Sequence, residues 1–313
     1  MDAPPSSSGD GDIAPLSQSY QPTWIREEDL LRRKLVLGDD FSWALDSCDG
    51  GAGGEPLRYV GGVDVSFSKD DPSLACGALV VVDLQQLQRP PQQQQRGREA
   101  AVGVVHEAFE LVRLRVPYIP GFLAFREAPI LLRLLEKTKR DALHFYPQLL
   151  MVDGNGILHP RGKFLHLHHV DGLTLSRVRQ LLQDPANASK NVFTLTGDSD
   201  QLWGAAIRSS PGSLKPIFVS VGHRIALESC IKVVKMCCKY RVPEPIRQAD
   251  MKSRQHLHTM QGIAPQGTYE KRMRHRGETL PSISVLSWSS EMGMSRQKDR
   301  SFINGLVDGV SGT

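Results

Sequence analysis

The chain has 313 residues, 40% hydrophobic and 23% charged, with a formal net charge of +4, which is enough apolar content for a real core. No apolar run approaches the roughly 18 residues of a membrane helix, and the first residues, MDAPPSSSGDGDI, lack the basic and apolar regions of a signal peptide. The five cysteines contain no CxxC pair, so we expect a reduced protein of the cytoplasm, the nucleus or both, not a secreted one. The mild basic excess is compatible with a nucleic-acid partner without requiring one.

The first half of the chain predicts a disordered tail followed by a helix and three strands. Residues 1–20 are rich in Pro, Ser, Gly and Asp and are expected to be disordered. A polar helix is expected over 23–36 and a glycine-rich linker over 46–55. Apolar patterning predicts strands at 59–67, 76–84 and 102–116. The glutamine-rich segment 85–99 fits an enlarged loop between the second and third of these strands.

The second half predicts a further helix at 121–139, a strand at 147–153, and then short strands and helices. These later elements are strands at 192–196, 202–207 and 216–221, a helix at 223–240, and a final helix from 243 to about 258. Residues 259–313 are expected to form a disordered tail that carries a short basic run. Three antiparallel strands, a helix and a strand that joins in parallel predict one α/β domain over residues 21–258. Its expected fold is a ribonuclease-H-like mixed central sheet flanked by helices.

Three carboxylates stand out among these elements. Asp64 interrupts an apolar strand, where an unpaired charge is costly to bury; Asp153 ends a strand, and Glu127 lies near the start of a helix. Because open α/β sheets bind ligands at the carboxyl ends of their strands, these oxygens predict a site for Mg²⁺ or Mn²⁺. His159 follows closely as a candidate acid or base. Taken singly, Asp153 also fits a turn cap, Glu127 a solvated helix face and His159 an ordinary loop residue.

Four sequence blocks resemble the endonuclease V family, whose members recognise deaminated adenine (inosine) in nucleic acid. The blocks are YVGGVDVSF (59–67), PYIPGFLAFRE (117–127), VDGNGILHPRG (152–162), and VSVGHRIALE with VPEPIRQAD (219–250). The resemblance spans residues 24–258 and is strongest toward eukaryotic members. It implies a monomeric, Mg²⁺-dependent endonuclease, with Mn²⁺ able to substitute. The implied reaction is hydrolysis of the second phosphodiester bond 3′ to inosine in RNA, single-stranded DNA or both.

The resemblance also implies roles for individual residues. Asp64, Glu127 and Asp153 match the metal-binding catalytic carboxylates, and His159 matches the active-site histidine. Tyr118, in the loop that precedes the helix at 121–139, matches the aromatic wedge of the family, which would replace base stacking worth ~1–3 kcal/mol per base. Ordinary loop packing is the alternative for this residue. The implied nucleic-acid and lesion-binding set contains this wedge, its flanking residues, a glycine-rich turn and a histidine: Pro117, Tyr118, Pro120, Gly121, Gly154, Asn155, Gly156 and His223.

The chain departs from the family after Gly162. The helix, strand and lysine that the family places next are missing, as after an internal deletion, and Lys163 is the nearest candidate for contacting phosphate. Because a crossover between parallel strands needs about a dozen residues or more, we expect altered pairing beyond Asp153 or a sheet that lacks one layer. Asp250 is a candidate outer carboxylate near the metal, or a partner of Arg247 on its own helix.

Two classes of function follow from these observations. The first is an active, inosine-directed endonuclease. The second is a catalytically impaired protein of the same fold that binds nucleic acid without cutting it. A third interpretation, in which the basic run in the tail makes the chain mainly an RNA-tethering protein, rests on composition alone.

Overall fold

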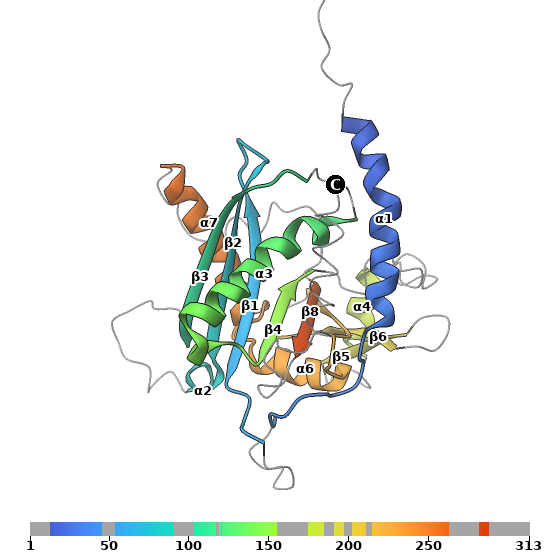
Figure 1. Cartoon of the computed structure of the whole chain (residues 1–313). Coiled ribbons are helices and arrows are strands. Elements are labelled where there is room, and N and C mark those ends of the chain that lie inside the picture. Colours follow the sequence, from blue (N-terminus) through green and yellow to red (C-terminus); the bar gives the residue numbers. More distant parts are fainter. Residues whose placement is uncertain are drawn as a thin grey trace, which may run out of the picture.

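A single mixed β-sheet organises the part of the chain that the computed structural model describes, which is residues 13–45, 54–89, 103–116, 119, 121–154, 175–184, 191–196, 202–210, 215–262 and 282–287. Within these residues the sheet has eight strands in the order β3-β2-β1-β4-β8-β7-β6-β5 (Figure 1). The strands are β1 Tyr59–Phe67, β2 Leu74–Asp83, β3 Val104–Arg113, β4 Leu149–Asp153, β5 Val192–Thr196, β6 Leu202–Ile207, β7 Ile217–Ser220 and β8 Ser282–Ser287.

The first four strands confirm the predicted ribonuclease-H-like order. Strand β2 pairs antiparallel with both β1 and β3, and β4 joins the other side of β1 in parallel. The bounds predicted for β1, β5 and β6 are those observed. The long helix that separates β3 from β4 provides the crossover that a parallel pair requires.

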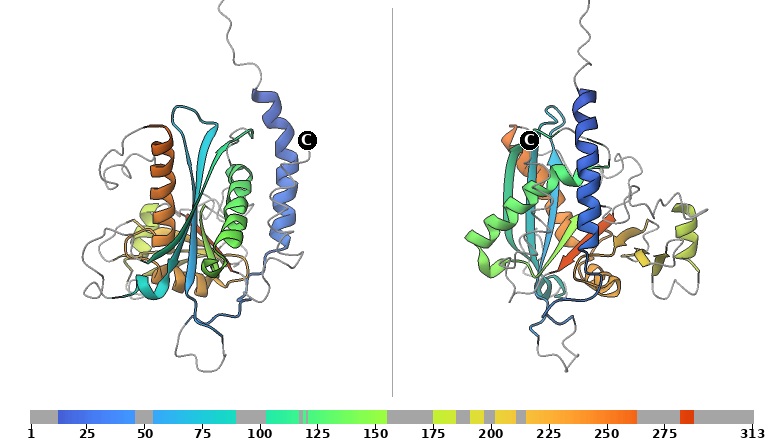
Figure 2. Two further views of the ribbon diagram at one scale, coloured as in Figure 1. Left: turned by 60° about the vertical axis from the view of Figure 1, so that its left-hand side comes forward. Right: turned by 45° about the vertical axis from the view of Figure 1, so that its right-hand side comes forward.

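Helices cover both faces of the sheet. They are α1 Ile13–Arg33, α2 Leu84–Leu87, α3 Leu123–Asp141, α4 Leu175–Leu181, α6 Leu227–Met236 and α7 Glu244–Met260, with a 3-10 turn η2 at Leu143–Phe145. Helices α3 and α7 lie on opposite sides of β1–β3 (Figure 2). No helix in this described part has the length and apolar character to cross a membrane.

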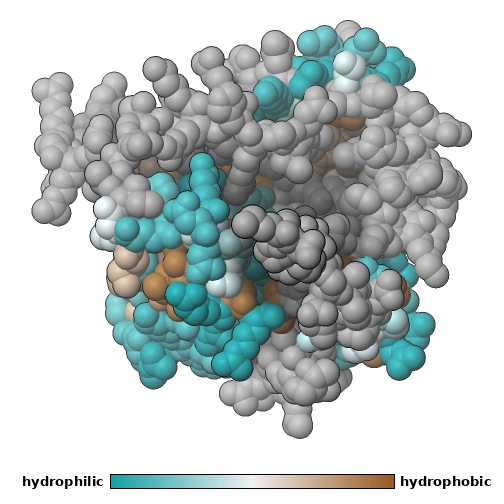
Figure 3. Space-filling model, turned by 90° about the horizontal axis from the view of Figure 1, so that it is seen from above, coloured by the Kyte–Doolittle hydropathy of each residue, from teal (hydrophilic) through white to brown (hydrophobic). Residues whose placement is uncertain are grey.

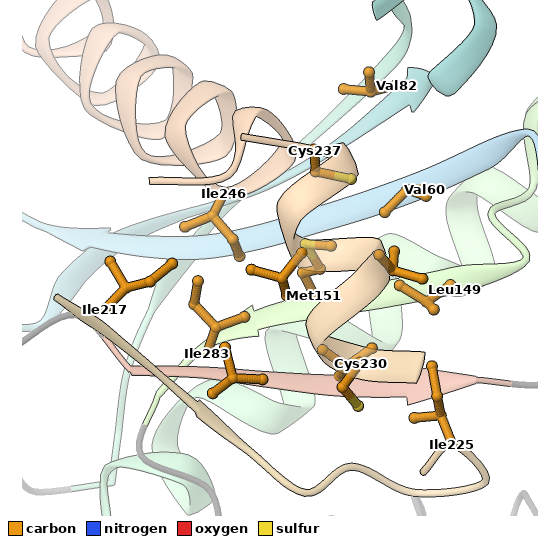
Figure 4. Close-up of a cluster of buried hydrophobic side chains, with 14 of the residues drawn as sticks. Val60, Val82, Leu149, Met151, Ile217, Ile225, Cys230, Cys237, Ile246 and Ile283 are labelled. Atoms are coloured by element: carbon orange, nitrogen blue, oxygen red, sulfur yellow. The ribbon is translucent and has the colours of Figure 1, made fainter. Parts of the chain in front are cut away.

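Two apolar cores match these two faces. One joins the sheet to α6 and α7 and includes Val60, Met151 and Ile246 (Figure 4). The other joins it to α3 and includes Val63 and Ile130. Since alternate residues of a strand point to opposite faces, this division tells which face each functional side chain of β1 and β4 occupies.

Glycine permits the closest approach between α7 and the sheet. A Cβ atom on Gly62 would lie 2.2 Å from the carbonyl carbon of Pro245, near the start of α7. The helix therefore rests directly on the backbone of β1 and carries its later residues across that strand.

Two boundaries differ from the sequence prediction. Helix α1 begins at Ile13 and not at residue 23, so it includes residues that were expected to be disordered. Stacking of Tyr20 on Trp24 one helical turn away, with ring centroids 5.1 Å apart, supports this extension. Helix α6 covers only Leu227–Met236 of the predicted 223–240.

The largest correction concerns the C-terminal tail. Residues 259–313 were expected to be disordered, yet Ser282–Ser287 form β8 in the interior of the sheet. The six residues alternate too briefly in a polar setting to predict a strand. Their structure comes from pairing with β4 on one side and β7 on the other.

Candidate metal centre

Asp64 lies in the middle of β1 and faces α7, because it is two residues from Gly62. Its side chain is buried, and its Oδ2 accepts a hydrogen bond from the Ser253 hydroxyl at 3.2 Å. The Ser66 hydroxyl lies 2.7 Å from that of Ser253 and extends the network. Hydrogen bonding of this kind is what allows a carboxylate to occupy an apolar strand.

Asp153 comes next to Asp64 through the register of the parallel pair. Val63 is opposite Val152, so each aspartate is the next residue on its strand. Met151 packs in the same core as α7, which places Asp153 on the α7 face as well. Two carboxylates thus occupy neighbouring positions on one face, near the carboxyl ends of β1 and β4.

Asp250 approaches the same place from α7. It is buried, its backbone carbonyl lies 3.1 Å from the Ser253 hydroxyl, and its carboxylate pairs with Arg254. The Arg247 guanidinium binds Glu244 one turn earlier at 2.6 Å, and its pairing with Asp250 stays a prediction. The Asp250 backbone carbonyl is therefore linked to Asp64 through Ser253. The role of Asp250 as an outer carboxylate stays a prediction.

Glu127 belongs to α3, on the opposite face of the sheet. It lies near the start of α3, which packs against the other core. The neighbouring Arg126 guanidinium lies over the Phe67 ring, 4.9 Å from its centroid, and donates to the Pro72 carbonyl at 2.8 Å. Since Phe67 is the last residue of β1, the first turns of α3 lie beside the end of that strand.

These carboxylates do not form a closed cage. Among the described side chains, no group of three His, Cys, Asp or Glu residues is placed to hold a metal ion. The all-oxygen donor set fits a hard divalent cation, and Mg²⁺ in particular is usually held by one or two carboxylates, with waters and substrate phosphates completing its shell. The neighbouring pair Asp64 and Asp153 fits that mode of binding.

A thiol beside the site stays neutral. Cys76 lies opposite Ser66 on β2. Burial, and after it the charges on the Asp64 and Glu110 carboxylates, raises the pKa of the Cys76 thiol to about 11. Near neutral pH this cysteine is protonated, so it does not compete as a thiolate ligand.

Several predicted site residues lie outside the described part of the chain. Nearby, Gly121 has φ +85°, a conformation that favours glycine, and Ile119 is buried against the aromatic rings of Trp24, Phe122 and Phe125. Among the described residues, a Cβ on Gly154 would meet nothing within 4 Å, so these residues leave open space there. The predicted residues outside the described part are Pro117, Tyr118, Pro120, Asn155, Gly156, His159 and Lys163.

His223 lies at the opposite end of the strands from the carboxylates. It follows β7, which runs parallel to β8 and therefore opposite to β4. The ring Nδ1 of His223 accepts a hydrogen bond from the Val36 backbone N–H at 3.3 Å. The backbone N–H of His223 donates to the Val285 carbonyl at 3.2 Å. The structure thus separates His223 from the carboxylates, and its contact with nucleic acid stays a prediction.

Seen from above, the side at which β1 and β4 end, the described surface is mainly hydrophilic with smaller hydrophobic areas among it (Figure 3). Sequence reasoning missed Ser253 and Ser66 as supports of Asp64. A serine inside a helix pattern carries no signal of its own, and only the contact between α7 and β1 reveals the pair.

A mixed sheet of this order, with neighbouring carboxylates on β1 and at the end of β4, defines an α/β protein of the ribonuclease-H-like class of nucleases. A family model described as endonuclease V matches residues 46–251, more than half of the chain. The chain belongs to the endonuclease V family.

Relatives in sequence and structure agree with this assignment. Human endonuclease V is 37% identical over 261 residues, covering 77% of this chain and 84% of the human protein. The mouse protein is 35% identical over 276 residues, covering 83% of this chain and 76% of its own length. The catalytic domain of human endonuclease V superimposes with a TM-score of 0.60 at 34% identity, covering 79% of this chain and 99% of that domain.

A nucleic-acid complex is among the similar structures. Endonuclease V of Ciona intestinalis, in complex with a 24-mer DNA containing an inosine followed by a ribo-adenosine, matches with a TM-score of 0.62. It is 28% identical and covers 77% of this chain and 99% of that chain. The family is one of metal-dependent nucleases, and these family structures share the fold of this chain.

Proposed function

We propose that this chain is a Mg²⁺-dependent endonuclease that hydrolyses the second phosphodiester bond 3′ to inosine in RNA, single-stranded DNA or both. The observation that carries the proposal is the neighbouring placement of Asp64 and Asp153 at the strand ends of an endonuclease V chain. The Ciona relative in complex with inosine-containing DNA supports the choice of substrate.

Asp64 and Asp153 would hold the cation, with Glu127 and the outer carboxylate Asp250 completing the negative site. A bound Mg²⁺ would activate water and neutralise charge on the phosphodiester. The protein's own contribution is orientation: the Ser253 hydroxyl fixes one oxygen of Asp64, and Arg254 holds Asp250. Mn²⁺, which takes the same oxygen ligands, is proposed to substitute.

The remaining roles follow the family pattern. We propose that His159 orients or deprotonates the attacking water and that Tyr118 separates inosine from its neighbours. The turn that begins at Gly154 would then admit the extruded base, in keeping with the open space beside it.

The proposal is tested by cleavage of matched oligonucleotides that carry either inosine or adenosine at one position, as RNA and as DNA, with Mg²⁺. Asp64→Asn and Asp153→Asn are expected to lower the rate by more than about a hundredfold. Asp141→Asn is the control, because that exposed carboxylate lies at the far end of α3 and pairs with Arg140. Cleavage that is equal in the parent and both site variants, or absent from all, would contradict the proposal.

One observation favours the second candidate function, an impaired nucleic-acid-binding protein. The strand next to β4 is β8, which comes from the C-terminal segment and runs antiparallel to β4. If this arrangement disables catalysis, the chain will bind inosine-containing RNA in Ca²⁺ yet leave it intact in Mg²⁺. Measurable Mg²⁺-dependent turnover excludes this candidate.

A further inference from the structure

Strand β8 occupies an interior place in the sheet although it lies outside the matched region 46–251. It forms five pairs with β4, from Leu149 opposite Ser287 to Asp153 opposite Ile283, and two with β7. The side chains of Ile283 and Val285 are fully buried in the core shared with α6 and α7. A terminal segment thus supplies the neighbour that β4 requires on its open side.

The contacts of β8 converge on the strand end that carries Asp153. Ile283 lies directly opposite Asp153, and the Ser284 hydroxyl donates to the Gly154 carbonyl at 3.3 Å. Ser284 is itself held by the buried Ser220 of β7, with the two hydroxyl oxygens 3.0 Å apart. A short chain of polar contacts therefore ties β7, β8 and the last residues of β4 together.

The middle of β8 is fitted just as closely. A Cβ on Gly222 would lie 1.8 Å from the Val285 carbonyl oxygen, so only glycine permits the approach. The same carbonyl oxygen accepts a hydrogen bond from the His223 backbone N–H. Without β8, the facing edge of β4 would present backbone groups that have no partner in the sheet.

We infer that residues 282–287 act as a positioning strand, which fixes the end of β4 and thereby sets the divalent-cation affinity of the site at Asp153. The inference rests on the proposed function of Asp153 as a metal ligand. Ser284 is the positioning residue at its centre: it touches neither cation nor substrate and acts through Gly154. The C-terminal segment is then part of the nuclease and no mere appendage.

The test uses full-length protein and two matched pairs of variants. Val285→Pro places a proline ring in the middle of β8, where it disrupts an interior strand, whereas Val285→Ala leaves the backbone of β8 free to pair. Ser284→Ala removes the hydroxyl, whereas Ser284→Thr keeps one. Hydrogen exchange of residues 149–154 reports pairing without requiring activity, and titration calorimetry with Mg²⁺ reports affinity.

Val285→Pro is expected to speed exchange across β4 by about tenfold or more, with Val285→Ala close to the parent. Ser284→Ala is expected to weaken Mg²⁺ binding about fivefold, with Ser284→Thr restoring it to within about twofold. Unchanged exchange in Val285→Pro, or unchanged Mg²⁺ affinity in Ser284→Ala, would overturn the inference. If Val285→Pro fails to fold, the serine pair decides.

Failure of the proposed function gives a different result. A parent protein that binds Mg²⁺ but cleaves no inosine-containing substrate contradicts that proposal, while exchange and calorimetry still decide the role of β8. Protection of β4 that falls on dilution would show that β8 comes from a second copy and would overturn its placement within one chain.

Discussion

The Ser253 hydroxyl lies 3.2 Å from Oδ2 of Asp64, although α7 and β1 are far apart in the chain. The hydroxyl has one proton and three nearby oxygens that can accept it, which belong to the Asp64 carboxylate, the Asp250 carbonyl and the Ser66 hydroxyl. Through Ser253, the Asp64 carboxylate is therefore linked to the backbone of α7 at Asp250.

Replacing Ser253 by alanine should weaken both stability and metal binding. The hydroxyl is fully buried, so its loss leaves buried acceptors with fewer donors and is expected to lower the free energy of unfolding by about 1–3 kcal/mol. Mg²⁺ binding should weaken as Asp64 loses orientation. Thr259→Ala on the same helix, where the hydroxyl is exposed and bonds to Gln255, is the control. Calorimetry that shows the same Mg²⁺ affinity in both variants would refute this role.

Gly62 is expected to be intolerant of a side chain. A methyl group there would overlap the Pro245 backbone, and separating α7 from β1 should cost about 1–3 kcal/mol or more. Gly38→Ala is the matched control, because its Cβ would meet nothing within 4 Å. Urea unfolding of both variants measures the difference, and equal midpoints would show that α7 can shift freely.

Trp24 is predicted to anchor the loop that contains the proposed wedge. Its ring stacks on Phe125 with centroids 4.9 Å apart and packs beside Phe122, so Trp24→Ala should destabilise the protein by about 3–5 kcal/mol. It should also weaken binding of inosine-containing RNA, measured in Ca²⁺ below the melting temperature.

A second buried tryptophan separates these two effects. Trp43 stacks on Phe41 and belongs to the core shared with α6 and α7. Trp43→Ala should therefore lower stability without weakening the binding of RNA. Equal loss of affinity in both variants would indicate a general consequence of destabilisation and contradict the anchoring role.

Stability should fall on acidification because of His106. Burial, and after it the charge on His144, lowers the pKa of His106 below its ordinary value of 6.5, with its Nε2 lying 3.2 Å from the Thr138 hydroxyl. The unfolded chain therefore takes up a proton first, so stability is lost as the pH falls below about 6.5 and through the lower folded pKa. Unfolding midpoints of the parent and His106→Gln at pH 7.5 and 5.5 test this, and the same loss in both would contradict it.

Local patterning predicted most of the fold because its apolar residues recur with clear periods. Strand β1 and helix α3 follow directly from such patterns. Asp64 was identifiable because a charged residue is unusual in a strand core. Strand β8 could not be predicted from the sequence, because six residues in a polar tail form a strand only when they pair with neighbouring strands. The hydrogen bond from Ser253 to Asp64 depends on tertiary packing, and the separation of His223 from the carboxylates depends on strand direction.

The late position of β8 also bears on how the molecule is made. Residues 149–153 pair with residues 283–287, so the central sheet cannot be completed before residue 287 has been synthesised. Domains generally fold as units during synthesis, and contacts between distant segments form slowly. The nascent protein therefore holds an open strand edge beside Asp153 until residues 282–287 emerge, and a chain that stops before them is expected to aggregate as well as to be inactive.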